Sequence, residues 1–197
     1  WKYALCFFLA AIPAAQAQSS KQLEITRATL VASTNAIQGG EAFQLGVLLE
    51  PKEGWHSYWE NPGDAGIPTT LEWQLPPGFT AGNIEWPRPE AINEGPLTVY
   101  GYYFPVFLPA TITSPDTLSA QSYTFTVKAK WLVCKDICIP ESADLDIILP
   151  SGNASPSQDA DRFTEHRQNR PVPVAETLSY EIQDHNIILS VPLTSLG

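Results

Sequence analysis

The stretch SYTFTVKAKWLVCKDICIP, residues 122–140, carries the most regular pattern in the chain and two of its three cysteines. From Ser122 to Val133 the odd positions are apolar or aromatic, and the even positions up to residue 130 are Ser, Thr or Lys. Because successive side chains of a strand point to opposite faces, this alternation predicts a strand with one face in a core and the other in solvent. If the strand continues to Cys134, that sulfur lies on the solvent side.

Cys134 and Cys138 are separated by only three residues. In an extended chain their Cα atoms would be ~13 Å apart, too far for a disulfide, so a bridge requires residues 135–137 to form a turn. In the chain-entropy model so short a loop adds only ~2 kcal/mol of stability. Reversible redox chemistry is the better explanation, since neighbouring thiols can resolve each other's mixed disulfides. A small structural bridge and two buried free thiols are the alternatives.

Two charged residues in the turn act on the cysteines in opposite directions. An accessible Cys134 near cations would hold a thiolate more readily than a buried one. Lys135 would favour that thiolate, whereas Asp136 would oppose it, so both are candidates for tuning the pKa of the thiol.

A second alternating run, residues 143–149, follows the cysteines and places Asp144 and Asp146 between apolar residues. The two runs predict a β-hairpin with the cysteine pair at its turn. Whether an aspartate faces Lys128 or Lys130 across this hairpin depends on a register that the sequence leaves open.

The composition favours an all-β fold for residues 18–150. The hydrophobic fraction of 44% argues against disorder, and 18 prolines and 12 glycines among short apolar runs indicate a turn-rich β protein. Residues 43–49 alternate as a clear strand, and shorter strands are expected at 22–34, 70–75 and 104–112. The net charge of −10, with no cluster of Lys and Arg, argues against nucleic acid as a partner.

The N-terminal residues predict export. Lys2 precedes an apolar run that is too short to span a membrane, and Ala15-Gln16-Ala17 has the small residues that a signal peptidase reads. Residues 1–17 are therefore expected to be a signal peptide, and the domain is expected in an oxidising compartment where disulfides form.

The C-terminal residues predict a linker and the start of a second β domain. Residues 151–175 have a linker-like composition, and the charged residues 162–170 within them are expected to form either a short helix or a solvated tether. New strand patterning then places the start of a second, truncated β domain at 176–197.

The segment GWHSYWENPGDAG, residues 54–66, concentrates three large aromatic residues before a turn. Trp55, Tyr58 and Trp59 are expected to close one end of a β-sandwich, and the alternative is a ligand-binding aromatic loop. His56 is interpreted as a hydrogen-bonded structural residue, with a ligand role as the alternative.

Four motifs together resemble a known family. Residues 54–68 (GWHSYWENPGDAGIP), the Trp-Pro at 86–87, Tyr100-Gly101-Tyr102 and CKDICIP at 134–140 are similar to the periplasmic N-terminal domain of the DsbD/ScsB family of membrane thiol:disulfide interchange proteins. The similarity extends over about residues 20–150, and its motifs point to the ScsB-like branch.

This resemblance implies an immunoglobulin-like β-sandwich in which Cys134 and Cys138 are the redox pair and Cys138 is the attacking sulfur. It implies that a membrane-embedded redox domain, downstream in the same polypeptide, supplies electrons that pass to periplasmic thioredoxin-like or disulfide isomerase proteins. The chain would thus be part of a protein-disulfide reductase, would lie in the periplasm, and would need no cofactor or metal.

The resemblance also implies that a loop caps the cysteines. DsbD spaces its cysteines more widely and shields them with a loop Phe before a Tyr-Gly, whereas this chain has Val99 before Tyr100-Gly101. Val99, Tyr100 and Tyr102 are therefore expected to form the cap or docking loop.

The sequence is also compatible with two other functions. One is a binding or assembly module with a structural disulfide. The other is copper capture by the two thiolates, which are soft ligands, as implied by the copper-tolerance association of ScsB-like relatives.

Overall fold

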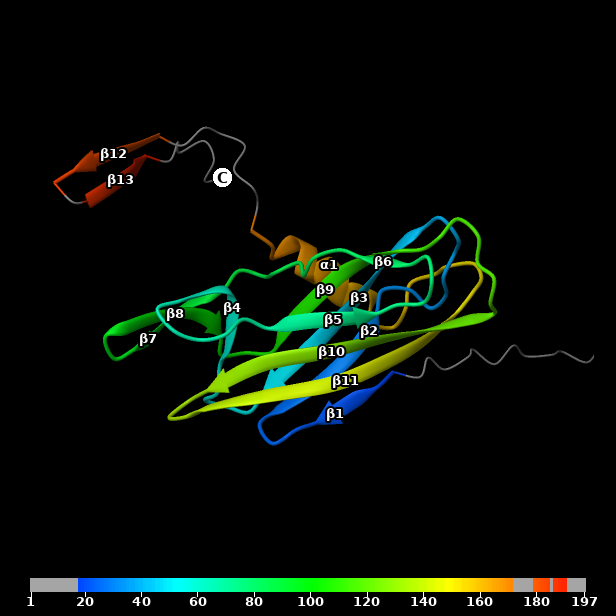
Figure 1. The fold of residues 1–197 in the computed structure, drawn as a ribbon, viewed down its shortest axis with the longest axis horizontal. Coiled ribbons are helices and arrows are strands. Elements are labelled where there is room, and N and C mark those ends of the chain that lie inside the picture. The colour runs from blue at the N-terminus through cyan, green and yellow to red at the C-terminus, as the bar shows by residue number, and fades with distance from the viewer. Residues whose placement is uncertain (1–17, 172–178, 185, 191–197) are drawn as a thin grey trace, which may run out of the picture.

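The computed structural model describes residues 18–171, 179–184 and 186–190. The predicted signal peptide, residues 1–17, lies outside the described residues. Most of the described chain forms antiparallel strands, and two sheets pack face to face around one hydrophobic core (Figure 1). The all-β expectation is therefore confirmed, and the fold is an immunoglobulin-like β-sandwich.

The first sheet of the sandwich contains five strands in the order β1-β2-β3-β9-β6. Their bounds are Ser20–Gln22 for β1, Thr26–Ala32 for β2, Ala42–Pro51 for β3, Val106–Thr113 for β9 and Thr80–Ala81 for β6. The facing sheet has the order β11-β10-β5, with bounds Cys138–Pro150, Ser122–Cys134 and Thr70–Gln74. A third sheet, β4-β8-β7, has bounds Ser57–Gly63, Leu97–Tyr102 and Glu90–Glu94.

The predicted hairpin is β10–β11, and it runs the length of the sandwich (Figure 1). Its register extends from Ser122 opposite Pro150 to Cys134 opposite Cys138. The odd positions of both strands are buried, apart from the half-buried Tyr123, Ile139 and Glu141, which confirms the alternation. The register places Lys128 opposite Asp144, so opposite charges meet on the outer face.

The outer face of the first sheet is covered by the helix α1 (Ala160–Gln168). Phe163 of α1 is buried in a small apolar cluster with Val31, Leu48 and Phe107, and its ring lies 4.9 Å from that of Phe107. The ring of Phe107 lies across β3 at Gly46, where a Cβ atom would come within 2.3 Å of it.

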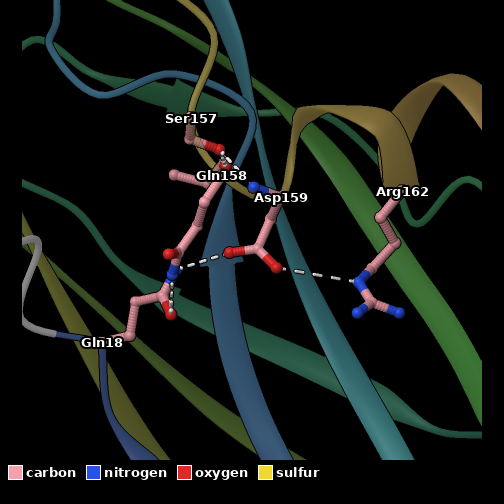
Figure 2. Close-up of polar contacts among 6 residues, drawn as sticks. Gln18, Ser157, Gln158, Asp159 and Arg162 are labelled. Atoms are coloured by element: carbon pink, nitrogen blue, oxygen red, sulfur yellow. Dashed lines mark hydrogen bonds and ion pairs between the residues drawn. The ribbon is translucent and has the colours of Figure 1, made fainter.

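The segment before α1 is also tied to the sandwich, as Figure 2 shows. Asp159 Oδ2 accepts a hydrogen bond of 2.8 Å from Gln18 Nε2, and Asp159 Oδ1 lies 3.9 Å from Arg162 Nε. Ser157 Oγ accepts from the Asp159 N–H and donates to the Ala32 carbonyl. Residues 162–168 are therefore helical, so the structure shows the short helix of the two alternatives expected for residues 162–170. Apolar side chains on β3 and β9 give this helix a surface to cover.

The predicted strand patterning near the C-terminus forms a hairpin of β12 (Ser179–Gln183) and β13 (Asn186–Ser190). Every residue of both strands is exposed. Whether this hairpin begins a second domain stays a prediction. No helix among the described residues has the length and apolar character needed to cross a membrane.

Candidate redox site

The cysteine pair closes the end of the β10–β11 hairpin. Cys134 and Cys138 form a disulfide with Cα atoms 4.1 Å apart, and residues 135–137 make the turn that the spacing required. The two cysteines differ in exposure, since Cys138 is exposed while Cys134 is only 1% exposed. An incoming sulfur can therefore reach Cys138 but not Cys134.

The expectation that Cys134 lies on the solvent side is wrong. Lys128 and Lys130 on the same face of β10 remain partly or fully exposed, but farther along the strand the third sheet covers this face. Cys134 is buried in a cluster with Tyr58, Ile92 and Val99, and Leu132 packs against the same cluster. The alternation identified the face correctly, and a sheet from elsewhere in the chain removes it from water.

Cys134 is also held by its backbone. Its N–H donates to the His56 carbonyl and its carbonyl accepts from the His56 N–H, both at 3.0 Å. The residue thus lies between His56 on one side and Cys138 on the other. Paired residues of antiparallel strands place their side chains on the same face, so His56, Cys134 and Cys138 form a row across the end of the hairpin.

The three expected cap residues lie on β8, which forms a hairpin with β7. Only Val99, which is fully buried, belongs to the cluster around Cys134. Tyr102 is buried in the main core, where its hydroxyl donates to the Pro87 carbonyl at 2.9 Å, and burial raises its pKa above the usual value. Tyr100 is 38% exposed, with its ring 6.4 Å from that of Trp59.

The aromatic residues of the 54–66 segment pack as structural residues. Trp55 and Trp59 are half-buried against the main core, and Tyr58 is buried beside Cys134. Gly66 has φ +105°, and a Cβ atom there would lie 2.3 Å from the ring of Tyr58. Glycine is therefore required at this position for the segment to close over the tyrosine.

His56 is buried and pairs with the partly exposed Glu94, a residue that no pattern in the sequence singled out. His56 is 1% exposed, its Nε2 lies 3.0 Å from Glu94 Oε1, and its ring packs edge-on against those of Tyr58 and Tyr103 at 5.1 and 5.2 Å. Among the described residues, neither ring nitrogen completes a hydrogen bond of good geometry. Burial lowers the pKa of His56, and the nearby Glu94 carboxylate opposes this.

A family profile described as "Thiol:disulfide interchange protein DsbD, N-terminal" matches residues 27–150, more than half of the chain. The chain belongs to the DsbD N-terminal family. This match confirms the resemblance found in the sequence and places both cysteines inside a thiol:disulfide interchange domain.

A solved structure of the ScsB type agrees with the family at the level of the fold. The N-terminal periplasmic domain of ScsB from Proteus mirabilis superposes with a TM-score of 0.64 at 16% identity, covering 89% of this chain and 68% of that domain. The reduced N-terminal domain of DsbD from Neisseria meningitidis has a TM-score of 0.32 at 13% identity, covering 66% of this chain and 90% of that one. A search of curated proteins found no match.

The charged residues of the turn lie at the surface of this DsbD-type domain. Lys135 and Asp136 are both exposed. A Cβ atom on Gly54 would lie 3.0 Å from Lys135 Nζ, so the lysine side chain lies over Gly54, two residues before His56. Their effect on the pKa of the thiols stays a prediction.

Exposed apolar side chains and a groove lie at the cysteine end of the β10–β11 hairpin. Exposed fractions are 64% for Ile137 in the turn and 60% for Ile67. A groove of about 370 Å³ adjoins the last strand pairs before the disulfide, lined by Ile67, Pro68, Leu132 and Pro140 among others. Exposed apolar side chains beside a groove are typical of protein–protein contact surfaces. The described residues contain no group of three or more His, Cys, Asp or Glu side chains placed to hold a metal ion.

Proposed function

We propose that this domain relays electrons in the periplasm by thiol–disulfide exchange, receiving them from a membrane-embedded reductase domain and passing them to periplasmic disulfide proteins. The observation that carries the proposal is the asymmetry of the cysteine pair within a domain of the DsbD N-terminal family. Cys138 is exposed and can attack a partner disulfide, while Cys134 is buried beside it and can resolve the mixed disulfide.

The apolar surroundings of Cys138 support a protein as the partner. Ile137 and the groove beside Leu132 and Pro140 offer contact area on the side from which a partner would approach. Val99 and Tyr58 bury Cys134 and would keep other thiols away from it. We assign the cap role to Val99, with Tyr100 as a rim contact and Tyr102 as a support of the fold.

A purely structural bridge accounts less well for this arrangement. The disulfide closes a three-residue turn at the end of a hairpin that is already paired along its whole length. Such a short loop stabilises a fold by only ~2 kcal/mol, and an exposed sulfur gains nothing from a structural role.

Cysteine-to-serine variants expressed in the periplasm test the relay. In Cys134→Ser, the remaining Cys138 is expected to accumulate as a mixed disulfide with an oxidised thioredoxin-fold protein, because the resolving sulfur is missing. In Cys138→Ser, the remaining Cys134 is buried and is expected to form much less of the mixed disulfide, because buried cysteines react far less than accessible ones. Acid quenching, alkylation and mass spectrometry identify the adducts.

The control is a variant with both cysteines replaced. If neither single variant forms an adduct, or if the double variant leaves its periplasmic partners as reduced as the wild type does, the relay proposal fails and the structural bridge is favoured.

A further inference from the structure

A buried histidine that faces the Glu94 carboxylate lies next to the sulfur that must resolve the mixed disulfide. His56 and Cys134 are cross-strand neighbours joined by two backbone hydrogen bonds of 3.0 Å. In such a pair the Cβ atoms lie about 5 Å apart on one face of the sheet. A polar ring buried without hydrogen bonds carries a free-energy cost, which a structural role alone does not explain.

Three groups are arranged in sequence: a buried sulfur, a buried imidazole and a carboxylate. Glu94 Oε1 lies 3.0 Å from His56 Nε2. Because a carboxylate accepts, the proton of the neutral ring is favoured on Nε2, which leaves Nδ1 as the proton-accepting atom. This order matches the general pattern of an activated nucleophile, in which a base sits beside the nucleophile and a third group orients the base. The Glu94 side chain is 29% exposed, so the chain of groups leads from the buried sulfur to solvent.

We propose that His56 is the base that takes the proton from the Cys134 thiol, and that Glu94 is the positioning residue that orients His56 and stabilises its imidazolium form. The inference rests on the proposed thiol–disulfide exchange and adds two residues to it. A thiol as buried as Cys134 ionises less readily than one in water, so the resolving step needs such a base.

The proposed step is balanced in protons and electrons. In the mixed disulfide, Cys138 Sγ is bonded to the partner's sulfur and Cys134 carries a thiol. His56 takes the thiol proton, and the Cys134 thiolate attacks Cys138 Sγ. The bond between the two cysteines forms, the bond to the partner breaks, and the partner's sulfur leaves with the electron pair and collects a proton. In this step Cys134 goes from thiol to disulfide, Cys138 stays at the disulfide level, and the partner's sulfur is reduced to a thiol. Over the attack and the resolution together, the cysteine pair gives two electrons to the partner.

The surroundings of His56 fit a base that is neutral before the reaction. Burial lowers its pKa from the ordinary value of 6.5, so the ring is mainly uncharged at pH 7 and can accept a proton. The titratable and charged groups around it are Tyr58 from β4, Glu94 from β7, Tyr103 after β8, Cys134 from β10, and Lys135 beside Gly54. Burial, with Glu94 and Tyr103, raises the pKa of Tyr58 to about 12, so this tyrosine does not compete as a base.

The reaction of the reduced protein with dithiobis(nitrobenzoate) measures the rate of the resolving step separately from the first attack. Cys138 attacks first and releases one thionitrobenzoate, and Cys134 then releases the second at the resolving rate. In the wild type the resolving rate constant is expected to rise with pH only up to the lowered pKa of His56 and then to level off. In His56→Gln it is expected to be about 100-fold lower at pH 7 and to rise about tenfold per pH unit, as expected for unassisted thiol ionisation.

Two further variants sharpen the test. Because Glu94 raises the pKa of His56, Glu94→Gln is expected to move the midpoint of the pH profile to lower pH and to lower the plateau. His166→Gln is the matched control, since His166 is also buried, also has its pKa lowered by burial, and belongs to α1 on the other sheet. It is expected to leave both phases unchanged.

The proposal is overturned if His56→Gln keeps the wild-type rate and plateau, or if His166→Gln slows the second phase to the same extent. Circular dichroism shows whether His56→Gln folds. If it does not, the pH profile of Glu94→Gln tests the proposal by itself. A midpoint of that profile equal to the wild-type midpoint then refutes the proposal. The assay uses no protein partner. Failure to trap a partner in the periplasm would therefore refute the relay while leaving this result standing.

Discussion

Replacing Gly101 by alanine is expected to destabilise the domain by about 3 kcal/mol and to expose Cys134 to small alkylating reagents. Gly101 lies in the middle of the third sheet, paired with Tyr58 on one side and Glu90 on the other. A Cβ atom there would lie 2.0 Å from the Ser57 carbonyl oxygen. Because this neighbour is backbone, β4 and β8 must separate to make room.

Separation of β4 from β8 would expose Cys134, because side chains of both strands bury it. Tyr58 and Val99 come from these two strands and both bury Cys134. In the reduced wild type, iodoacetamide is expected to modify Cys138 quickly and Cys134 slowly, and mass spectrometry of digested protein measures both. In Gly101→Ala both cysteines are expected to react quickly.

Gly152→Ala is the control for this substitution. Gly152 is exposed, has no described atom within 4 Å of its ideal Cβ position and does not have a positive φ. Its replacement is expected to change neither the denaturation midpoint nor the alkylation pattern. Slow alkylation of Cys134 in Gly101→Ala would show that β4 and β8 do not provide the cover.

Phe163→Ala is expected to cost about 3 kcal/mol, at the low end for removal of a buried aromatic ring, because α1 can detach from the sheet and limit the loss. Phe163 is 1% exposed and is the apolar residue by which α1 packs against Val31, Leu48 and Phe107. Urea denaturation measures the loss. Detachment would also expose these three side chains, so increased binding of an anilinonaphthalene dye is expected.

Glu165→Ala provides a comparison on the same helix. Glu165 is exposed, and alanine has the higher helix propensity, so stability is expected to stay within about 0.5 kcal/mol of the wild type. Equal destabilisation by the two substitutions would mean that helix formation, not the burial of Phe163, controls the attachment of α1.

The hairpin that carries the cysteines was predictable because both of its strands alternate over most of their length. Burial of one face of each strand leaves a single consistent orientation. The register was not predictable, since Lys128 or Lys130 opposite either aspartate satisfies the same pattern. The observed pairing of Lys128 with Asp144 follows from the three-residue turn between Cys134 and Cys138.

The burial of Cys134 was not predictable from the same pattern. Alternation assigns a side chain to a face of the sheet, but what covers that face depends on contacts distant in sequence. Here the cover comes from β4, which precedes Cys134 by about 70 residues, and from the β7–β8 hairpin. A long separation in sequence also hid the pair of His56, which directly precedes β4, and Glu94, at the end of β7.

The sequences of β3 and β9 contain a weak indication that something covers the outer face of the first sheet. Leu48 and Phe107 are apolar, and both are buried on the face of the first sheet away from the main core. Large apolar residues at such positions indicate that something covers them. Because residues 160–168 contain only one large apolar side chain, Phe163, their composition matched that of a linker.

The backbone pairing of Cys134 with His56 also bears on the direction in which electrons leave the domain. These two hydrogen bonds do not involve the bond to Cys138, so they hold Cys134 in place when the disulfide opens. The two thiols of the reduced form then remain neighbours at the end of a paired hairpin, and the effective molarity of one toward the other is high. If the pair acts in the proposed relay, ring closure is expected to outcompete attack by outside thiols, and the pair is expected to give up its electrons more readily than it accepts them.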